Sequence, residues 1–379
     1  MKHPCALTMV IAACVLSSVA APSPTLEQRA GLHVFETIEG LKAERRVDAQ
    51  HLTLTSPIVH AGFDCTEAIL SWNTKAPDGG EFSFEIAPII KDEPRRFYAL
   101  GTWCKDNAAM RRKSYQKDLD EFASVSTDTL VLKRPVKSFV IRVTLSGPEE
   151  PMADWIQFLS VAFSGPRAAG STSPAVHNAA DGSRLKPPAS EPERIELTVP
   201  ALSQLSYAGG KAWCSPTSLA MVLNYWSARL DRTDLGVDVP ATAASVFDPD
   251  WGGTGNWSFN TAFAGTFPGM RACVARFENL ESLKTCLSAD VPVVASVSYN
   301  RLKGLDKGGS GHLVVVIGFE ANGNPLINDP GTSEGIRRII PVDRFKAAWA
   351  ESKNTVYLVA PADRHARLLR SLRLGLAGD

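Results

Sequence analysis

The sequence predicts an α+β protein of two parts, an all-β sandwich domain followed by a domain in which helices pack on an antiparallel sheet. Three observations support this. Short segments that alternate apolar and polar side chains fill residues 30–165. A stretch rich in Ala, Ser, Pro and Gly then interrupts the pattern, and after residue 195 strand-like and helix-like runs are mixed. A chain of 379 residues is long enough for about two domains.

The composition is that of an ordinary soluble protein, with 44% apolar and 21% charged residues. Lys plus Arg and Asp plus Glu both number 40, so the formal net charge is zero. Because there is no basic excess, we expect no nucleic-acid partner. No Cys or His spacing fits a zinc site, and we expect no metal or other cofactor. The oligomeric state stays unknown at this stage.

Residues 1–20 have the pattern of a signal peptide, which predicts a secreted, periplasmic or otherwise extracytoplasmic protein. Lys2 and His3 precede an apolar run from Ala6 to Val15, and Ser18–Ala20 forms a cleavage site. A lipoprotein acceptor at Cys14 is the alternative. No other stretch approaches the ~20 apolar residues of a membrane span, so we expect no transmembrane segment in the mature chain.

Five cysteines remain after removal of the signal, and an odd count in an oxidising compartment leaves one thiol unpaired. The simplest pairing joins Cys65 with Cys104 and Cys273 with Cys286, and it leaves Cys214 free. The alternative is that the other four are reduced and buried.

Residues 30–165 predict an antiparallel β-sandwich. Phe82–Ile86 and Phe139–Val143 alternate apolar and polar residues, and Pro77–Gly80 is a turn signal. The domain contains Trp72, Trp103 and Trp155. We expect these tryptophans in the core, with a platform for a sugar as the alternative.

Residues 166–194 predict a linker, since Pro, Ser and Ala dominate and apolar side chains are sparse. Limited proteolysis is expected to cut here first and to leave two folded fragments.

Residues 195–361 predict the second domain. Its expected elements are strands at 196–200, 270–277, 291–299, 313–319 and 325–328, and helices from Cys214 and at 280–287. Residues 362–379 form a basic helix or tail, expected at the surface.

Cys214 follows a glycine-containing loop and opens an amphipathic helix, with Ser215 as a possible cap and Pro216 in the first turn. The helix dipole favours a thiolate at this position, and the thiolate is the form that attacks carbonyls. The alternative is a buried cysteine in a core helix.

A thiol nucleophile needs a base and a group that orients the base. His312 follows the loop Gly308–Gly311 at the start of a buried strand, and Asp329 ends the neighbouring strand. A two-residue turn at Asn322-Gly323 would leave His312 and Asp329 roughly 13 Å apart. A bulge, a bend or a turn centred nearer Ala321 must therefore close this gap. The other histidine of this half, His365, lies in the tail and is a poor candidate.

Four segments together resemble the C39-like cysteine peptidases, papain-like domains related to the bacteriocin-processing peptidases of export transporters. They are Gln204, Trp213–Ser218, Ser310–Gly318 and Asn328–Pro330. The stretches Gly253–Trp257 and Phe259–Ala262 resemble a secreted, stand-alone branch that carries a β-rich N-terminal domain. The resemblance is specific over residues 197–361.

This resemblance implies a papain-like domain with Cys214 as nucleophile, His312 as base and Asp329 as orienting group. It also implies Gln204 as an oxyanion-hole donor beside a backbone N–H near Cys214. Two features depart from the transporter peptidases. Ser215 stands where they carry Gly, and Gln204 lies ten residues before Cys214, more than is usual there.

The function predicted from the sequence is an exported thiol hydrolase that cleaves a peptide or isopeptide bond, with a peptide or protein as substrate. One alternative is a catalytically idle envelope protein that binds a glycan or a protein. The other is a thiol acyltransferase that cross-links its substrates.

Overall fold

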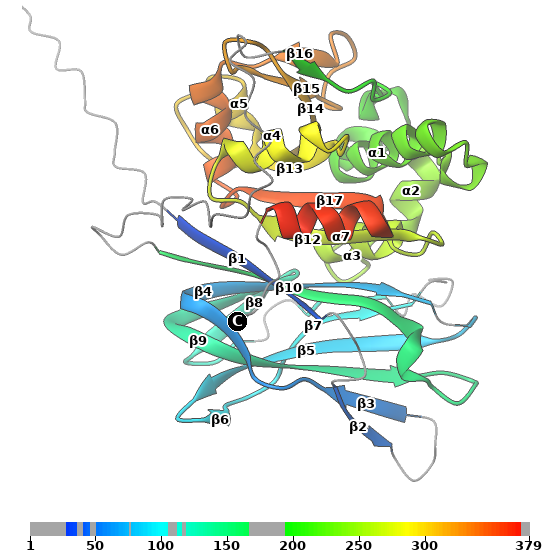
Figure 1. Ribbon diagram of the computed structural model, residues 1–379, viewed down its shortest axis with the longest axis vertical. Helices are drawn as coiled ribbons and strands as arrows, with labels where there is room; N and C mark the ends of the chain where they lie inside the picture. The colour runs from blue at the N-terminus through cyan, green and yellow to red at the C-terminus, as the bar shows by residue number, and fades with distance from the viewer. Residues whose placement is uncertain are drawn as a thin grey trace, which may run out of the picture.

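The computed structural model describes residues 28–35, 41–45, 51–75, 77–104, 112–115, 119–166 and 194–372. Figure 1 shows two domains stacked along the long axis, the β-rich domain below and the mixed domain above. The expected signal peptide at 1–20, residues 167–193 of the expected linker and residues 373–379 of the tail lie outside the described residues.

The first domain is antiparallel throughout, as the alternating pattern predicts, with strand order β1-β10-β4-β9-β3-β2. Strand β9 also pairs with β5 and β8, so the long strands carry the sheet from one layer of the sandwich to the other. The elements are β1 (Gln28–Phe35), β2 (Lys42–Arg45), β3 (His51–Thr55), β4 (Val59–Thr74), β5 (Glu81–Ile90), β6 (Glu93–Pro94), β7 (Tyr98–Trp103), β8 (Ala123–Ser126), β9 (Thr129–Ser146), η1 (Ala153–Trp155) and β10 (Ile156–Pro166).

The three tryptophans of this domain fill its core. Trp72, Trp103 and Trp155 are at most 5% exposed. Trp72 stacks on Phe84 with ring centroids 3.9 Å apart. A buried indole has no face to offer a sugar, so the alternative of a sugar platform is wrong for these residues.

The second domain holds a seven-stranded antiparallel sheet in the order β12-β17-β13-β14-β15-β16, with β11 beside β14. The strands are β11 (Ile195–Glu196), β12 (Met270–Arg276), β13 (Val293–Ser298), β14 (Gly311–Phe319), β15 (Pro325–Asn328), β16 (Arg337–Ile339) and β17 (Thr355–Pro361). The helices are α1 (Cys214–Leu230), α2 (Val239–Val246), α3 (Trp257–Ala264), α4 (Leu280–Ser288), α5 (Tyr299–Leu302), α6 (Val342–Ala350) and α7 (Ala362–Ser371), with short turns η2 (Gln204–Ser206), η3 (Gly210–Ala212) and η4 (Thr233–Leu235).

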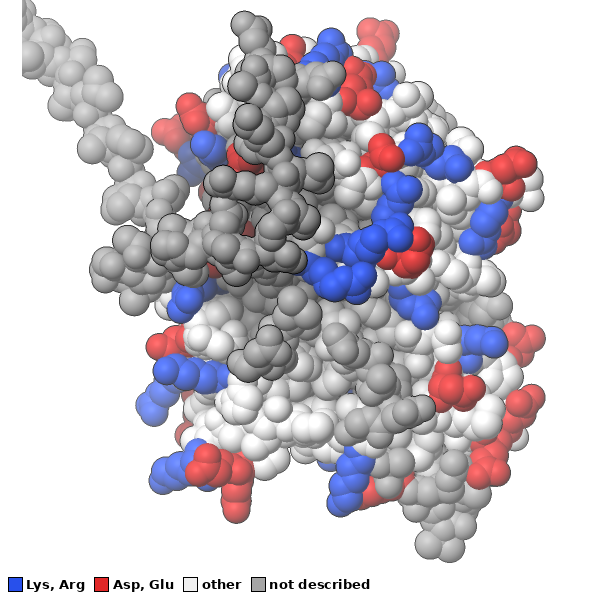
Figure 2. Space-filling view, viewed as in Figure 1, with Lys and Arg blue, Asp and Glu red and all other residues white. Residues whose placement is uncertain are grey.

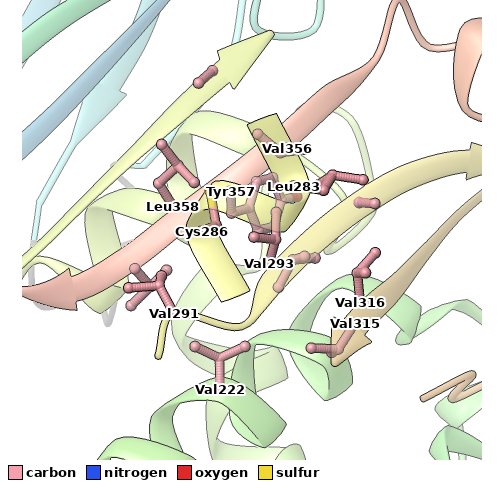
Figure 3. Close-up of a cluster of buried hydrophobic side chains, with 14 of the residues drawn as sticks. Val222, Leu283, Cys286, Val291, Val293, Val315, Val316, Val356, Tyr357 and Leu358 are labelled. Carbon is pink, nitrogen blue, oxygen red and sulfur yellow. The ribbon is translucent and has the colours of Figure 1, made fainter. Parts of the chain in front are cut away.

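Helix α1 packs on this sheet, which confirms the predicted fold class. Residues 219–223 of the helix are fully buried. Figure 3 shows Val222 of α1 close to the cluster that Val293 of β13 and Leu283 and Cys286 of α4 form around the sheet. Trp226 extends the contact by donating from Nε1 to the carbonyl of Val359 at 2.8 Å. The helix that begins with Cys214 is therefore held along most of its length.

The C-terminal helix α7 also belongs to this core. His365, Leu368 and Leu369 are buried, and the guanidinium of Arg364 lies 5.5 Å from the ring centre of Trp226. The segment expected as a surface helix or tail is therefore packed up to residue 371. Its spacing of leucines on one face, among arginines on the other, is what such a docked helix requires.

None of the five described cysteines forms a disulfide, so the predicted disulfides are wrong. Cys65 donates to the carbonyl of Glu67 at 3.0 Å, and Cys273 faces Nε2 of His365 at 3.5 Å. Cys65, Cys104, Cys273 and Cys286 are at most 1% exposed. The alternative, that these four are reduced and buried, is the one the structure supports.

The two domains meet where the free edge of β12 lies against β4. Asn73 of β4 accepts from the backbone N–H of Ala272 at 3.0 Å and donates to its carbonyl at 2.9 Å. Ser71 accepts from the N–H of Val274 at 2.8 Å. An edge strand that lacks a neighbour leaves these groups unpaired, and here side chains of the sandwich take the neighbour's place.

Apolar side chains and an ion pair reinforce this contact. Ile69 and Phe158 of the sandwich join the core cluster of the second domain, while Phe259 of α3 joins that of the sandwich. Arg276 of β12, whose side chain is 2% exposed, pairs with Glu67 of β4 at 2.7 Å. Because the cores are shared in this way, we no longer expect two independently folded fragments after cleavage between the domains.

On the face seen in Figure 2, positive and negative side chains are interspersed over both domains. Among the described residues, the structure has no helix that is both long and apolar enough to cross a membrane.

Candidate active site

The N-terminus of α1 is fastened to the neighbouring strand by hydroxyl groups. The helix begins at Cys214, whose side chain is partly exposed, and Trp213 is its N-cap. Ser215 does not cap the helix as expected, because its hydroxyl hydrogen-bonds the buried hydroxyl of Tyr357 at 2.8 Å. Ser218 donates to the carbonyl of Leu313 at 3.1 Å. These bonds fix the position of Cys214 relative to β17, which carries Tyr357, and to β14, which carries Leu313.

His312 is the second residue of β14 and is 5% exposed. The loop before it turns through Gly309 and Ser310, which both have positive φ angles, +81° and +56°. Such a conformation is unusual for a serine and is held here by surrounding contacts. The N–H of Tyr299 donates to the carbonyl of Ser310 at 2.8 Å and closes the loop. His312 therefore enters the sheet from a fixed direction.

Asp329 reaches His312 because the register of β14 and β15 shifts. Phe319 pairs with Pro325, but after a bulge Val316 pairs with Ile327. The bulge moves Asp329 toward His312 by comparison with a regular two-residue hairpin. His312 Nε2 and Asp329 Oδ1 are 2.8 Å apart. The turn and the bulge together shift the pairing by two residues, so Asp329, which follows the partner of Val315, lies about two residues along the strand from His312 instead of four. The two side chains span the remaining distance.

The carboxylate of Asp329 is fully buried and has three partners. Besides His312, the N–H of Gly331 donates to Oδ1 at 2.9 Å and Arg338 donates to Oδ2 at 2.9 Å. Burial opposes ionisation, but the hydrogen bond and charge of His312, with Gly331 and Arg338, outweigh it and lower the pKa of Asp329. The carboxylate is thus held charged behind the imidazole.

Cys214 and His312 shift each other's pKa. Burial alone disfavours the thiolate, but the hydrogen bond and charge of His312, with backbone hydrogen bonds at Leu313 and Ser215, lower the pKa of Cys214. Burial also disfavours the imidazolium, yet hydrogen bonds to Asp329 and Cys214 raise the pKa of His312 to about 9. Because Nε2 faces Asp329, the nitrogen left for the thiol is Nδ1. The pair therefore favours thiolate and imidazolium at neutral pH.

Two neighbours hold the imidazole in place. The ring of Tyr299 lies over His312 with centroids 4.1 Å apart, and its hydroxyl donates to the carbonyl of Gly331 at 3.2 Å. A Cβ on Gly331 would lie 2.9 Å from Cε1 of His312 and 2.9 Å from the Tyr299 hydroxyl. The glycine is therefore required by close approach and not by its backbone angles.

Gln204 returns to the site although ten residues separate it from Cys214. The turns η2 and η3 fold the intervening chain back, and Gly209 at the bend has φ +82°. A Cβ on Gly210 would lie only 1.9 Å from the Gln204 carbonyl oxygen. The amide Nε2 donates to the carbonyl of Lys211 at 2.7 Å, and Oε1 has no partner among the described residues. One bond thus orients the amide and leaves its second N–H available.

A cleft of about 870 Å³ opens over these groups. Gln204, Cys214 and His312 all line it, while Asp329 lies behind the imidazole. The turn between β8 and β9 of the sandwich, residues 126–129, and the loop 251–255 of the second domain also line it. The structure therefore brings together the four residues singled out in the sequence and adds a wall from the first domain.

Several contacts of this site have no clear signal in the sequence. Arg338 and Gly331 follow Asp329 after a turn, and no pattern joins them to His312. Tyr299 had a usable signal, because it directly follows β13, the strand that pairs with β14, and Val297 of β13 is the partner of His312. A pairing of these two strands in register would have predicted an aromatic neighbour for the imidazole.

No group of three His, Cys, Asp or Glu side chains in the described ranges is arranged to hold a metal ion. The other Cys–His contact, Cys273 with His365, has the opposite electrostatics. Burial raises the pKa of the Cys273 thiol and lowers the pKa of His365 to about 4, so both groups stay neutral. The carboxylate behind His312 is what distinguishes the pair of Cys214 and His312 from the pair of Cys273 and His365.

Alkylation is expected to modify Cys214 first and to leave the other four thiols untouched in the folded protein. The thiolate is the reactive form, and among the described cysteines only Cys214 is partly exposed and lowered in pKa. The alkylation rate of Cys214 should stay high down to mildly acidic pH. In His312→Ala the rate should already fall at the higher pH at which an ordinary thiol becomes protonated. Peptide mass spectrometry after a short pulse of iodoacetamide measures both. Faster labelling of Cys273 or Cys286 would contradict this assignment.

Residues 196–357 match the Peptidase_C39 like family, and residues 25–164 match the Peptidase C39 N-terminal domain. A crystal structure of a C39-like peptidase from Bacillus anthracis is similar at 20% sequence identity and a TM-score of 0.35, over 44% of this chain and 98% of the other. No curated protein matches the chain.

Proposed function

We propose that the chain, whose residues 196–357 match the C39-like peptidase family, is an exported thiol hydrolase that cleaves a peptide or isopeptide bond with Cys214, His312 and Asp329. The observation that carries the proposal is the hydrogen-bonded series from thiol to imidazole to buried carboxylate beneath an open cleft. A structural cysteine in a core helix would have neither the lowered pKa nor the access.

In this mechanism the thiolate of Cys214 attacks the carbonyl carbon of the scissile bond. The negative charge that develops on the carbonyl oxygen is stabilised by Nε2–H of Gln204 and by an N–H at the start of α1, where the helix leaves such groups unpaired. The imidazolium of His312 then gives its proton to the departing amine and an acyl-thioester remains. Water, deprotonated by His312, attacks the thioester and releases the acid and the thiol.

Export rests on residues 1–20, whose pattern is that of a signal peptide. Cleavage after Ala20 would give a mature protein that begins at Ala21. N-terminal sequencing of protein recovered outside the cytoplasm tests this part of the proposal separately from catalysis.

Digestion of a peptide library by the mature protein, read by mass spectrometry, tests the enzymatic part, with Cys214→Ala as the control. New termini that depend on Cys214 support the hydrolase. Intact peptides, with Cys214 fully reactive toward iodoacetamide, would favour the idle binding protein. Products that carry an added amine would favour the acyltransferase.

Gly331→Ala is expected to lower the rate of peptide cleavage by about 10²-fold while changing stability little. The new Cβ would press on Cε1 of His312, and displacement of a catalytic group by about 1 Å costs a factor of this size. The measurement is kcat/KM together with the urea midpoint. Gly323→Ala is the control, since no atom lies within 4 Å of its Cβ position, although its φ of +83° adds strain. A Gly331→Ala enzyme of full activity would mean that the imidazole is not confined there.

A further inference from the structure

A part of the cleft wall outside the described machinery is built jointly by the two domains. It consists of the β8–β9 turn of the sandwich, residues 126–129, and the loop 251–255 of the second domain. The stretch from Asp248 to Asn260 is rich in Gly, Asp and Trp. None of these residues takes part in the proposed chemistry.

The β8–β9 turn is fixed to the second domain. Asp128, 5% exposed, accepts from the N–H of Trp257 at 2.5 Å at the start of α3, and from the hydroxyl of Thr129 at 3.0 Å. Thr127 has a φ of +57°, a conformation that a β-branched residue adopts only when its surroundings impose it. Ser126 at the tip is exposed. A substrate in the cleft would thus meet a rigid surface of the N-terminal domain.

The loop 251–255 is fixed by a buried carboxylate. Asp248 is fully buried and accepts from the side-chain amide of Asn256 at 3.0 Å. It also accepts from the backbone N–H of Trp251 at 3.4 Å and from that of Ser114, a residue of the sandwich, at 3.3 Å. Both parts of the wall are therefore held by bonds that cross between the domains.

Trp251 lies at the start of this loop, and its indole ring is partly exposed to solvent. It is 42% exposed, and it is the one exposed tryptophan of the eight in the chain, all of which the structure describes. Its ring lies across the loop, because a Cβ would approach it within 2.7 Å at Gly253 and 2.9 Å at Gly255. The glycines make room for the indole to lie flat.

A second large apolar side chain, Leu205, is 46% exposed and lines the same cleft. An aromatic ring held rigidly in solvent gains free energy when an apolar group covers it, and it loses little side-chain entropy on binding. The carboxylate of Asp128 is already occupied by donors, so the wall offers no free acid to a basic side chain. The chemistry that fits the wall is that of a bulky apolar side chain.

Resting on the proposed function, we propose that Trp251, with Leu205 and the β8–β9 turn, forms a subsite that binds a bulky apolar side chain of the peptide substrate. The N-terminal domain is then a part of the specificity determinant, since its turn closes the subsite.

Binding tests the subsite without requiring catalysis. In Cys214→Ala protein, short labelled peptides that differ in one residue are titrated by fluorescence anisotropy. Peptides with Phe or Leu should bind about 10- to 100-fold more tightly than those with Ala or Ser. Trp251→Ala should bring this ratio close to one, and Trp251→Phe should retain most of it. Gly255→Ala, which displaces the indole without removing it, should give an intermediate ratio.

Ser126→Arg tests the part played by the N-terminal domain, because it fills the subsite from a residue outside the peptidase domain. It should lower the preference for Phe and Leu, whereas Ile58→Arg, an exposed turn position of the same domain outside the cleft, should not. Leu230→Ala, an exposed residue at the end of α1, is the control for Trp251→Ala.

The same peptides and variants are then compared in cleavage by protein with Cys214 intact, alongside the rate of Cys214 alkylation. If Phe and Leu peptides bind selectively but wild type does not cleave them, the proposed hydrolase is refuted and the subsite is supported. Cleavage or binding whose side-chain preference is the same in Trp251→Ala and wild type would overturn the subsite and leave the hydrolase standing.

Discussion

His312→Ala is expected to lower the rate of peptide cleavage by about 10⁴- to 10⁶-fold, nearly as much as Cys214→Ala, because a nucleophile and its base act as a unit. Without the imidazole the thiolate is no longer favoured and the leaving amine receives no proton. Asp329→Asn should cost less, about 10²- to 10⁴-fold, since an imidazole that is poorly oriented still visits the productive geometry. Burst-corrected kcat values for the three variants measure these losses.

The pH dependence of cleavage by the wild-type protein is a second test of the role of His312. His312 is raised in pKa to about 9, so the imidazolium that protonates the amine persists through neutral pH and is lost above pH 9. Cleavage should therefore fall on the alkaline side near pH 9, while alkylation of the thiolate should not. On the acidic side both should fall together, as the thiolate of Cys214 takes up a proton.

His60→Ala is the matched control, because His60 contacts Ser138 on the exposed surface of the sandwich, away from the cleft. Equal cleavage rates in His312→Ala and His60→Ala would refute the proposed base. If the pH profiles of cleavage are superimposable for wild type and Asp329→Asn, Asp329 does not orient His312.

Glu67→Gln is expected to destabilise the whole chain by about 3–5 kcal/mol, because it leaves the buried guanidinium of Arg276 without its counter-charge. Glu67 lies on β4 and Arg276 on β12, so the loss falls on the contact between the domains. Since hydrophobic side chains of each domain belong to the core of the other, we expect one cooperative transition that shifts as a unit. Urea unfolding followed by tryptophan fluorescence and circular dichroism measures it.

Glu85→Gln is the control for this variant. The pair of Glu85 with Arg142 has the same 2.7 Å separation and lies in the same sandwich, but both side chains are partly exposed. Such a pair contributes about 0–1 kcal/mol. The contrary result is two separate unfolding transitions, only one of which shifts in Glu67→Gln. It would show that the domains unfold independently and that the shared cores contribute little to stability.

The positions of Cys214 at the start of a helix and of His312 at the start of a strand could be predicted from the sequence, but their contacts could not. The helix after Cys214 and the strand after His312 follow from local apolar patterns, which depend on neighbouring residues alone. The approach of Asp329 depends on a bulge between Val316 and Gly318, and one extra residue in a strand leaves the apolar pattern almost unchanged.

The wrong predictions, of a disulfide and of a helix cap, also concern contacts that local sequence patterns do not determine. Proximity in sequence predicts a pairing of Cys273 with Cys286, but both thiols are free and buried in the core. Ser215 has the residue type of a helix cap, but a hydroxyl from a distant strand, that of Tyr357, takes its hydrogen bond. Contacts between domains, such as Asn73 with Ala272, have no local signal at all.

The capped edge of β12 has a consequence for self-association. The sheet of the second domain ends at β12, and an open edge strand can pair with a strand of another molecule. Ser71 and Asn73 of the sandwich occupy backbone groups of Val274 and Ala272 on this edge. The N-terminal domain therefore also protects the second domain against aggregation through β12.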